Sequence, residues 1–425
     1  MALRTAADRS TGPDLQPRRA AFPALRHRDF RLLWLAQLVS VTGSQMQTVA
    51  INWHVYLLTK SPLALGLVGL VRVVPIVLCS LVGGVVADAI DRKRLMIVTQ
   101  TVMLVSAAIL AGFTASGLDE VWPIYLLTAI ASAAVAFDNP ARQALLPTLV
   151  PAEDFANAVS LGTVVFNSAM IVGPALAGLL LAGHGPALIY AVNAVSFLAV
   201  IIALLLMQAS GRPESGEQAV SRVSFGALGE GLRFVWRTPI IVQTMTLDFI
   251  ATFFASATAL LPIYAAEILK VGARGLGLLA AAPATGSVIT GLVMARFGTF
   301  KRQGQLVVVS IAIYGAATIL FGLSRWFALS LVMLAITGAA DTVSTVLRQT
   351  IRQLITPNHL RGRMTSVNMI FFMGGPQLGE MEAGAVAALI GATLSVVTGG
   401  VGCLIAAAIA GLTAKSLLQY DGPSH

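Results

Sequence analysis

Hydrophobic residues recur along nearly the whole chain in long runs, which short polar segments separate. A run of about 20 apolar residues spans a bilayer core as a helix, because a helix bonds every backbone polar group internally. The pattern therefore predicts an all-α polytopic membrane protein with twelve transmembrane helices. The expected spans are residues 31–57, 63–87, 95–115, 121–142, 158–182, 187–207, 239–264, 274–296, 304–323, 326–347, 364–390 and 392–414.

The polar segments divide the chain into parts. The longest of them, residues 208–238, separates six spans in residues 30–207 from six more in residues 239–414. Residues 1–29 are rich in Arg but lack the apolar segment of a signal peptide, so they predict a disordered basic tail. Residues 415–425 form a second tail. The chain is thus interpreted as two six-helix bundles joined by a linker.

Composition and charge support this interpretation. The 425 residues are 56% hydrophobic and 11% charged, whereas soluble domains carry about 25% charged residues. The net charge of +9 would favour a nucleic-acid partner in a soluble protein. Successive spans cross the membrane in opposite directions, and this places most of the 28 Lys and Arg residues on the same side of the membrane as the N-terminus. That bias predicts cytoplasmic termini and no nucleic-acid partner.

The two halves share residues at a constant spacing of 206. The identities are Arg142 with Arg348, Gln143 with Gln349, Pro151 with Pro357, Ser160 with Ser366, Gly173 with Gly379, Ala177 with Ala383, and Gly178 with Gly384. Abundant Gly and Ala inflate such matches, but Arg, Gln and Pro at one common spacing are harder to obtain by chance. Transporters are commonly built from such repeats, so we expect two pseudo-symmetric bundles.

A short charged turn joins the second and third spans and contains Gly84, Asp88, Asp91, Arg92, Lys93 and Arg94. These residues fill every specified place of the loop 2–3 signature of the major facilitator superfamily, so the turn is similar to that signature. The resemblance implies a twelve-helix fold of two bundles and a gate that ties the halves together on the cytoplasmic side. Asp138 and Arg142, one turn apart at the end of the fourth span, would belong to this gate. The alternative is a topology signal only.

Three further stretches, residues 137–147, residues 157–159 with 172–179, and residues 374–384, resemble the bacterial branch that contains the enterobactin exporter and the macrolide-efflux proteins. This resemblance implies a monomeric protein of the bacterial inner membrane that exports a small amphipathic molecule, driven by the proton gradient. It also implies helix-packing roles for Gly173, Pro174 and Gly178. The C-terminal counterpart of the charged turn departs from the pattern, since Ala295 stands where the Asp is expected.

Ionisable residues inside spans are costly and are candidates for function. Arg72 and Glu380 are expected about 24 and 25 Å above the cytoplasmic ends of spans 2 and 11, because a helix rises about 1.5 Å per residue. These spans adjoin in the superfamily fold, so the two residues could form an ion pair between the halves. Glu382 is a second possible partner, and Asp248 could bind a proton. The alternative is a static packing bridge.

By resemblance, spans 1, 4, 7 and 10 surround the substrate. The candidate cavity residues on these spans are Gln45, Asn52, Gln243, Phe249, Phe253 and Asp341. Flexible and aromatic side chains would supply an adaptable apolar wall, although packing against lipid or other helices explains the Phe residues equally well. The two acids, Asp248 and Asp341, favour a neutral or cationic substrate.

The chain also lacks the motifs of other function classes. It contains no phosphate-binding loop of the ATPase type, no metal-binding motif and no nucleophile–base constellation. We therefore expect no cofactor and no enzymatic activity. The sequence leaves open a drug exporter, an exporter of a siderophore or another endogenous metabolite, and a membrane sensor or scaffold that transports nothing.

Overall fold

The computed structural model describes residues 22–118, 120–211, 233–254, 256–298, 300–357 and 360–421. Within two helices, the side chains of residues 81–85, 87–89, 361–363, 365–367 and 369–373 also lie outside this description. Most of the expected N-terminal tail and of the expected linker therefore falls outside it as well.

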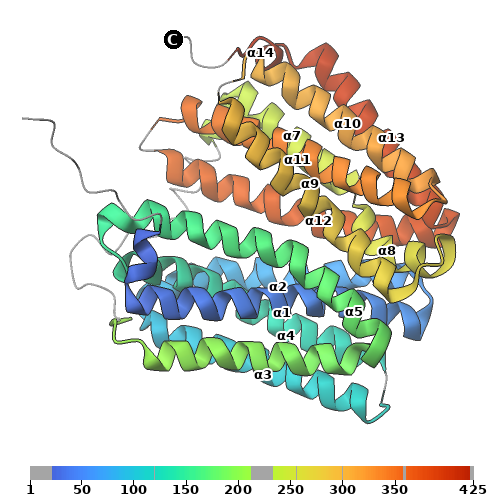
Figure 1. Ribbon diagram of the computed structural model, residues 1–425. Helices are drawn as coiled ribbons and strands as arrows, with labels where there is room; N and C mark the ends of the chain where they lie inside the picture. The colour runs from blue at the N-terminus through green and yellow to red at the C-terminus, as the bar shows by residue number, and fades with distance from the viewer. Residues whose placement is uncertain are drawn as a thin grey trace, which may run out of the picture.

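The described part of the chain is helical and contains no strand. Figure 1 shows two groups of long helices. The N-terminal group consists of α1 (Arg28–Thr59), α2 (Pro62–Ala89), α3 (Arg92–Ala115), α4 (Val121–Leu145) and α5 (Ala152–Leu206). The C-terminal group consists of α7 (Pro239–Phe254), α8 (Leu261–Ile263), α9 (Gly272–Phe297), α10 (Gln303–Leu323), α11 (Phe327–Ile355), α12 (Arg361–Ile390), α13 (Ala392–Thr413) and α14 (Lys415–Leu418).

Helix α5 combines two of the expected spans. It is 55 residues long, but Gly185 interrupts its helical geometry with φ 74° and ψ −175°. In the C-terminal half, Gly391 separates α12 from α13 with φ 88° and ψ 155°. Both conformations suit glycine, which lacks a Cβ. These two glycines are also 206 residues apart, so the repeat extends to the backbone of the equivalent turns.

The seventh expected span differs from its prediction as a continuous helix over residues 239–264. Helix α7 ends at Phe254, and a 3₁₀ turn (Ala257–Leu260), the short α8 and a π turn (Tyr264–Ile268) follow. Pro262 explains part of this break, because proline has no backbone N–H to donate to the carbonyl of Thr258.

In the described part of the chain, nine helical segments are long and apolar enough to cross a membrane. Helix α5 is counted once among them, although Gly185 divides it. Helices α1 and α12 have 32 and 30 residues but are not among the nine. The fold class of a multi-span helical membrane protein is confirmed, and the count of twelve spans stays a prediction.

The two halves share a core at one end only. One cluster of buried apolar residues mixes both halves and includes Tyr56, Leu181, Tyr264 and Ala383. At the other end, one cluster holds only N-terminal residues and another only C-terminal residues. We call the end with the shared core the far face, and the end that holds Ala24 and Leu417 the termini face. In Figure 1 the two groups diverge toward the termini face, on the left.

Close helix crossings join the halves near the far face. Helix α5 packs on α9, and α2 packs on α12. A Cβ added to Gly178 would lie 2.8 Å from the Cα of Gly277, and one added to Gly384 would lie 2.7 Å from the Cα of Gly66. Small residues permit such close approach of membrane helices. The repeated glycines Gly178 and Gly384 therefore mark two equivalent crossings.

Candidate substrate cavity and charge clusters

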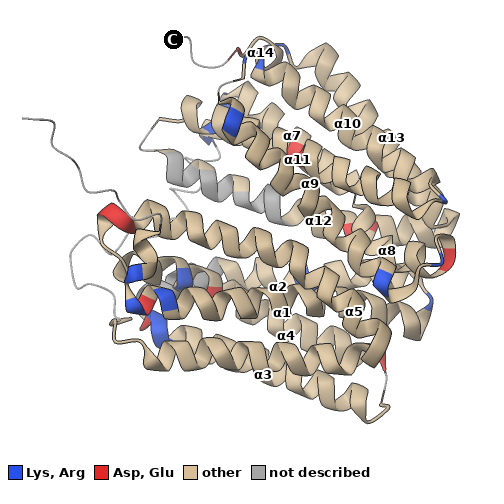
Figure 2. Ribbon diagram, viewed as in Figure 1, with Lys and Arg blue, Asp and Glu red and all other residues tan. Residues whose placement is uncertain are grey.

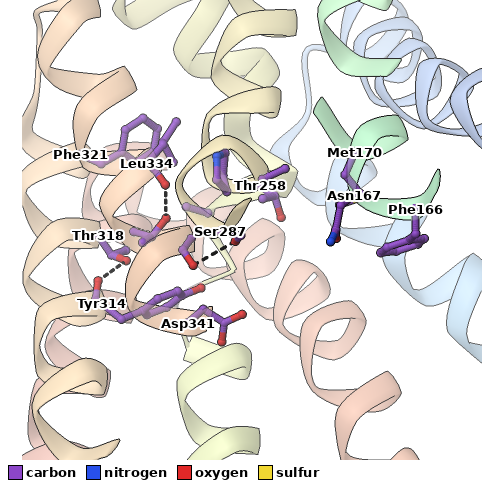
Figure 3. Close-up of a pocket in the computed structure, with 15 residues that line it drawn as sticks. Phe166, Asn167, Met170, Thr258, Ser287, Tyr314, Thr318, Phe321, Leu334 and Asp341 are labelled. Atoms are coloured by element: carbon purple, nitrogen blue, oxygen red, sulfur yellow. Dashed lines mark hydrogen bonds between the residues drawn. The ribbon is translucent and has the colours of Figure 1, made fainter. Parts of the chain in front are cut away.

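A cavity of about 280 Å³ lies where the C-terminal half faces α5 of the N-terminal half. In Figure 3 residues of α5 lie across from residues of the C-terminal half. Its labelled lining residues are Phe166, Asn167, Met170, Thr258, Ser287, Tyr314, Thr318, Phe321, Leu334 and Asp341. The wall combines aromatic, aliphatic and Met side chains with several polar side chains, as is common in small-molecule sites.

Asp341 is the charged residue of this cavity lining. The hydroxyls of Ser287 and Thr318 donate to the backbone carbonyls of Gly338 and Tyr314, at 3.0 and 2.9 Å. The side chain of Asp341 is 48% exposed. It can therefore meet a cation, a hydrogen-bond donor or a proton that enters the cavity.

Asp341 belongs to a group of charges, which we call the C-half cluster, together with three buried residues: Asp248, Arg348 and Arg352. Arg348 Nη2 lies 2.8 Å from Asp248 Oδ1 and 3.9 Å from Asp341 Oδ1. Arg352 Nη1 lies 4.0 Å from Asp248 Oδ2. The side chains of Arg348 and Asp248 are 1% and 6% exposed, so each charge depends on its partner for solvation.

The N-terminal half has a counterpart, the N-half cluster, made of Gln37, Thr99, Gln100, Asp138 and Arg142. Asp138 is buried and accepts hydrogen bonds from Thr99 Oγ1 at 2.9 Å and Gln100 Nε2 at 3.0 Å. Arg142 Nη1 donates to Gln37 Oε1 at 2.5 Å, and Arg142 Nη2 donates to Asn139 Oδ1. Nη2 also lies 3.8 Å from Asp138 Oδ2. Arg142 keeps 32% of its side chain exposed.

Residues 19–419 match the family described as transmembrane secretion effector, MFS_3. The chain belongs to this family. Membership confirms the expected major facilitator superfamily, and it confirms the expectation of a transporter-type membrane protein rather than an enzyme.

Two relatives of this secretion effector have described activities. The chain is 26% identical over 367 residues to the multidrug efflux pump Tap of Mycolicibacterium fortuitum. These aligned residues make up 84% of this chain and 88% of Tap. The chain is also 26% identical over 385 residues to the enterobactin exporter EntS of Shigella boydii, which covers 89% of this chain and 90% of EntS.

Solved structures agree with the fold. A bacterial homolog of the human lysosomal transporter Spinster, in an inward-facing and unoccupied conformation, superposes with a TM-score of 0.73 at 16% identity, over 94% of this chain and 99% of that one. The nucleoside transporter NupG gives 0.70 at 11% identity, over 92% and 100%. At such identities the likeness concerns the fold alone.

In the described part of the charged turn between α2 and α3, the side chains of Asp91, Arg92 and Lys93 bind within the N-terminal half. Asp91 caps α3 by accepting from the backbone N–H groups of Lys93 and Arg94, at 3.0 and 3.2 Å. Arg92 Nη1 donates to the carbonyl of Ala144 at 3.0 Å, and Lys93 Nζ donates to that of Met207 at 2.7 Å. Two cations thus meet carbonyls at or near the C-terminal ends of α4 and α5, where the helix dipole favours positive charge. The side chains of Gly84 and Asp88 lie outside the described residues.

The candidate coupling residues lie along the α2–α12 crossing. Glu380 packs directly on Gly69, since its Oε2 would lie 2.9 Å from a Cβ added there. Thr258 Oγ1 is 3.5 Å from Glu380 Oε1. Arg72 and Glu380 interact electrostatically, although no direct ion pair joins these two described side chains. Glu382, also on α12, makes no ion pair with a cation in the described part of the chain.

The structure separates the candidate cavity residues. Asp341 lines the cavity, whereas Gln243 Oε1 accepts from Ser416 Oγ at 2.9 Å near the termini face. Phe249 and Phe253 stack on each other at 5.7 Å and lie beside α12. The remaining two are on α1, where Gln45 packs against Gly173 and Asn52 is half-buried.

The candidate packing residues lie in two contacts of α5. Gly173 faces α1, where an added Cβ would lie 2.6 Å from the Cβ of Gln45. Gly178 faces α9, where an added Cβ on Gly277 would lie 2.5 Å from the carbonyl oxygen of Pro174. The first contact lies within the N-terminal half and the second joins the halves.

Sequence reasoning missed two sets of residues. It placed Arg348 among the cations of the termini side and did not assign it as the partner of Asp248. The repeat with Arg142 was a usable signal, since that Arg also stands beside an acid. It also missed Phe166, Asn167 and Ser287, and here no motif was available because helix rotation decides which face borders the cavity.

Proposed function

We propose that this secretion effector exports small amphipathic molecules by proton antiport, through alternating access of a central cavity. The observation that carries the proposal is the cavity bordered by both halves, with an apolar wall and one half-exposed acid, Asp341. The halves share their core at the far face and have separate cores at the termini face. That arrangement suits a carrier that opens on one side at a time.

The orientation follows from charge. Figure 2 shows Lys and Arg gathered at the termini face of the N-terminal half, which the positive-inside bias assigns to the cytoplasm. The protein then lies in a bacterial inner membrane with both termini cytoplasmic. In this orientation the halves are closed against the outside, so a cytoplasmic molecule would reach the cavity first. The charged turn at residues 84–94 would close the cytoplasmic side in the opposite state.

Two carboxyls are candidates for proton coupling. Asp341 faces the cavity, and Glu380 lies at the crossing of α2 and α12, beside Thr258. Asp248 is a weaker candidate, because Arg348 holds it in a buried pair. Protonation of Glu380 would remove its attraction to Arg72 and shift the balance between the closed and open far face. The protein would need no bound cofactor and would act as a monomer.

The comparisons favour two substrate classes equally. The relative Tap is a multidrug efflux pump and the relative EntS is an enterobactin exporter, and both are 26% identical to this chain. Drug-type amphipathic molecules are the primary proposal, and a siderophore or other endogenous metabolite is the second. A sensor or scaffold would carry no flux at all.

Purified protein in liposomes tests the proposal. An imposed pH gradient should drive uptake of labelled substrates from a panel of antibiotics and siderophores into inside-acidic vesicles. Glu380→Gln should remain folded but lose the response to the gradient, whereas Gly112→Ala on α3 should behave as wild type, because nothing lies within 4 Å of a Cβ added there. Wild-type vesicles without pH-dependent flux for any substrate would support the sensor alternative.

A further inference from the structure

A second cavity, of about 460 Å³, lies in the N-terminal half between α1, α4 and α5. Its wall includes Phe30, Trp34, Val159 and Phe166, and the wall is mostly apolar. Phe166 also lines the central cavity, so the two spaces adjoin at this residue. We call the second space the Arg142 cavity, because Arg142 is the charged residue of its lining.

Two hydrogen-bond donors border the apolar wall of the Arg142 cavity. Arg142 Nη1 donates to Gln37 Oε1 at 2.5 Å, which fixes the orientation of the Gln37 amide. The Nε2 of Gln37 is buried and has no hydrogen-bond partner among the described residues. Gln37 itself is 8% exposed and lines the cavity. A buried donor without a partner is unfavourable, so a ligand that offers an acceptor oxygen would satisfy it.

Asp138 pairs with Arg142 but leaves part of the guanidinium exposed to the cavity. Its side chain is 5% exposed, and its Oδ1 already accepts from Thr99 and Gln100. Its Oδ2 lies 3.8 Å from Arg142 Nη2, which is an ion pair without a direct hydrogen bond. Arg142 is 32% exposed, so a molecule in the cavity meets the guanidinium while the acid stays behind it.

We infer that the Arg142 cavity is a substrate subsite for amphipathic acids, in which Arg142 and Gln37 bind the oxyanion and the apolar wall holds the body of the molecule. The inference rests on the proposed export function and names the substrate class of that function. It differs from the preference for a neutral or cationic substrate that Asp248 and Asp341 suggested from sequence alone. Arg348 pairs with Asp248, and Asp341 lines the central cavity rather than the Arg142 cavity. Guanidinium groups bind carboxylates through paired N–H donors, which gives the subsite geometric selectivity.

Three probes with one ring system separate charge from hydrophobicity: naphthoate, naphthamide and naphthylmethylammonium. Their equilibrium binding is measured on the full chain in nanodiscs of phosphatidylcholine. Naphthoate should bind tightest to the wild-type protein. Arg142→Gln should weaken naphthoate roughly 10- to 100-fold, while naphthamide changes about threefold or less because it makes no charged contact. Arg142→Lys should recover part of the naphthoate affinity.

Gly162 provides a second test that leaves Arg142 in place. It lines the Arg142 cavity, and nothing lies within 4 Å of a Cβ added there. Gly162→Leu should therefore fold and fill the space, weakening both naphthoate and naphthamide. Gly112→Leu is the matched control, since Gly112 on α3 is equally free of neighbours and lies outside the cavity lining. It should bind all three probes as the wild type does.

Several results would overturn the inference. One is equal affinity of the wild-type protein for the three probes. Another is naphthoate binding that neither Arg142→Gln nor Gly162→Leu weakens. A third is loss of naphthoate binding when phosphatidylglycerol replaces phosphatidylcholine, which would identify a lipid headgroup as the occupant. The proposed function fails separately. Liposomes that show no pH-driven flux would refute antiport even if naphthoate binds at Arg142, and flux that ignores Arg142 would refute only the subsite.

Discussion

Arg142 and Arg348 occupy equivalent positions of the two halves but have opposite environments. Arg348 is 1% exposed and pairs at 2.8 Å with Asp248, which α7 supplies from across the bundle. Arg142 is 32% exposed and lies 3.8 Å from Asp138, one turn earlier on the same helix. The repeat thus preserves the residue while the source of its partner differs.

The difference shows how one repeated residue can take two roles. A guanidinium that is fully buried against a carboxylate from another helix stabilises its own half and is inaccessible to a ligand. A guanidinium that is partly exposed beside an open cavity, as Arg142 is, remains accessible to a ligand. We therefore expect the C-half cluster to govern stability and the N-half cluster to govern binding.

The largest expected effect is on stability, at Asp248. Asp248→Leu leaves Arg348 buried with only Asp341, at 3.9 Å, nearby. Removing one partner of a buried pair costs about 3–5 kcal/mol, so the unfolding midpoint of the detergent-solubilised protein should fall sharply. The double variant Asp248→Leu with Arg348→Met removes both charges and should regain most of the loss. A small effect of the single variant would show that the C-half cluster is not a structural pair.

A second pair of equivalent positions, Gly178 and Gly384, should respond alike. Each approaches a partner glycine so closely that an added Cβ would lie 2.8 or 2.7 Å from its Cα. Gly178→Ala and Gly384→Ala should each cost about 1–3 kcal/mol through overpacking. Both should also make the far face more accessible to a thiol-reactive probe. Gly183→Ala is the control, since nothing lies within 4 Å of that site. A response from only one of the two crossings would contradict their equivalence.

The two crossings should differ in their response to pH. Glu380 on α12 is the counterpart of Pro174 on α5, since the two are 206 residues apart. At this pair of positions, the α2–α12 crossing therefore has a carboxyl and the α5–α9 crossing has a proline. We expect a lower pH to protonate Glu380, weaken its attraction to Arg72 and favour opening of the far face. In the wild type, the opening equilibrium constant should change roughly tenfold with pH, and Glu380→Gln should abolish this change. Spin-label distances across the far face measure the equilibrium. Pro174→Ala should keep it, and an unchanged pH response in Glu380→Gln would exclude this carboxyl.

The smallest effect is expected for the stability of Arg142→Gln. Because Arg142 is partly exposed and Asp138 keeps its hydrogen bonds from Thr99 and Gln100, the loss should be about 1 kcal/mol or less. Thermal unfolding of the detergent-solubilised protein measures it beside Asp248→Leu. A loss as large as that of Asp248→Leu would remove the distinction between the two clusters.

Sequence reasoning predicted the membrane class, the helices and the repeat because hydrophobic length and cation placement depend on the bilayer alone. It could not predict the break of α7 after Phe254, although Pro262 was visible, because proline is tolerated in other spans of this chain, such as Pro75 in α2. It proposed Asp341 for the cavity, and the cavity lining includes this residue. It placed Arg72 and Glu380 at one depth, which stays a prediction. Helix rise per residue gives depth directly.

The sequence by itself determined that this chain crosses a membrane repeatedly, in two related halves with charged ends. Only the tertiary structure decided that Asp248 belongs to Arg348, that Gly178 and Gly384 form matching crossings, and that Arg142 borders an apolar cavity. The physical reason is rotational. Hydropathy specifies that a helix lies in the bilayer, whereas its rotation and its neighbours come from side-chain packing between helices far apart in the chain.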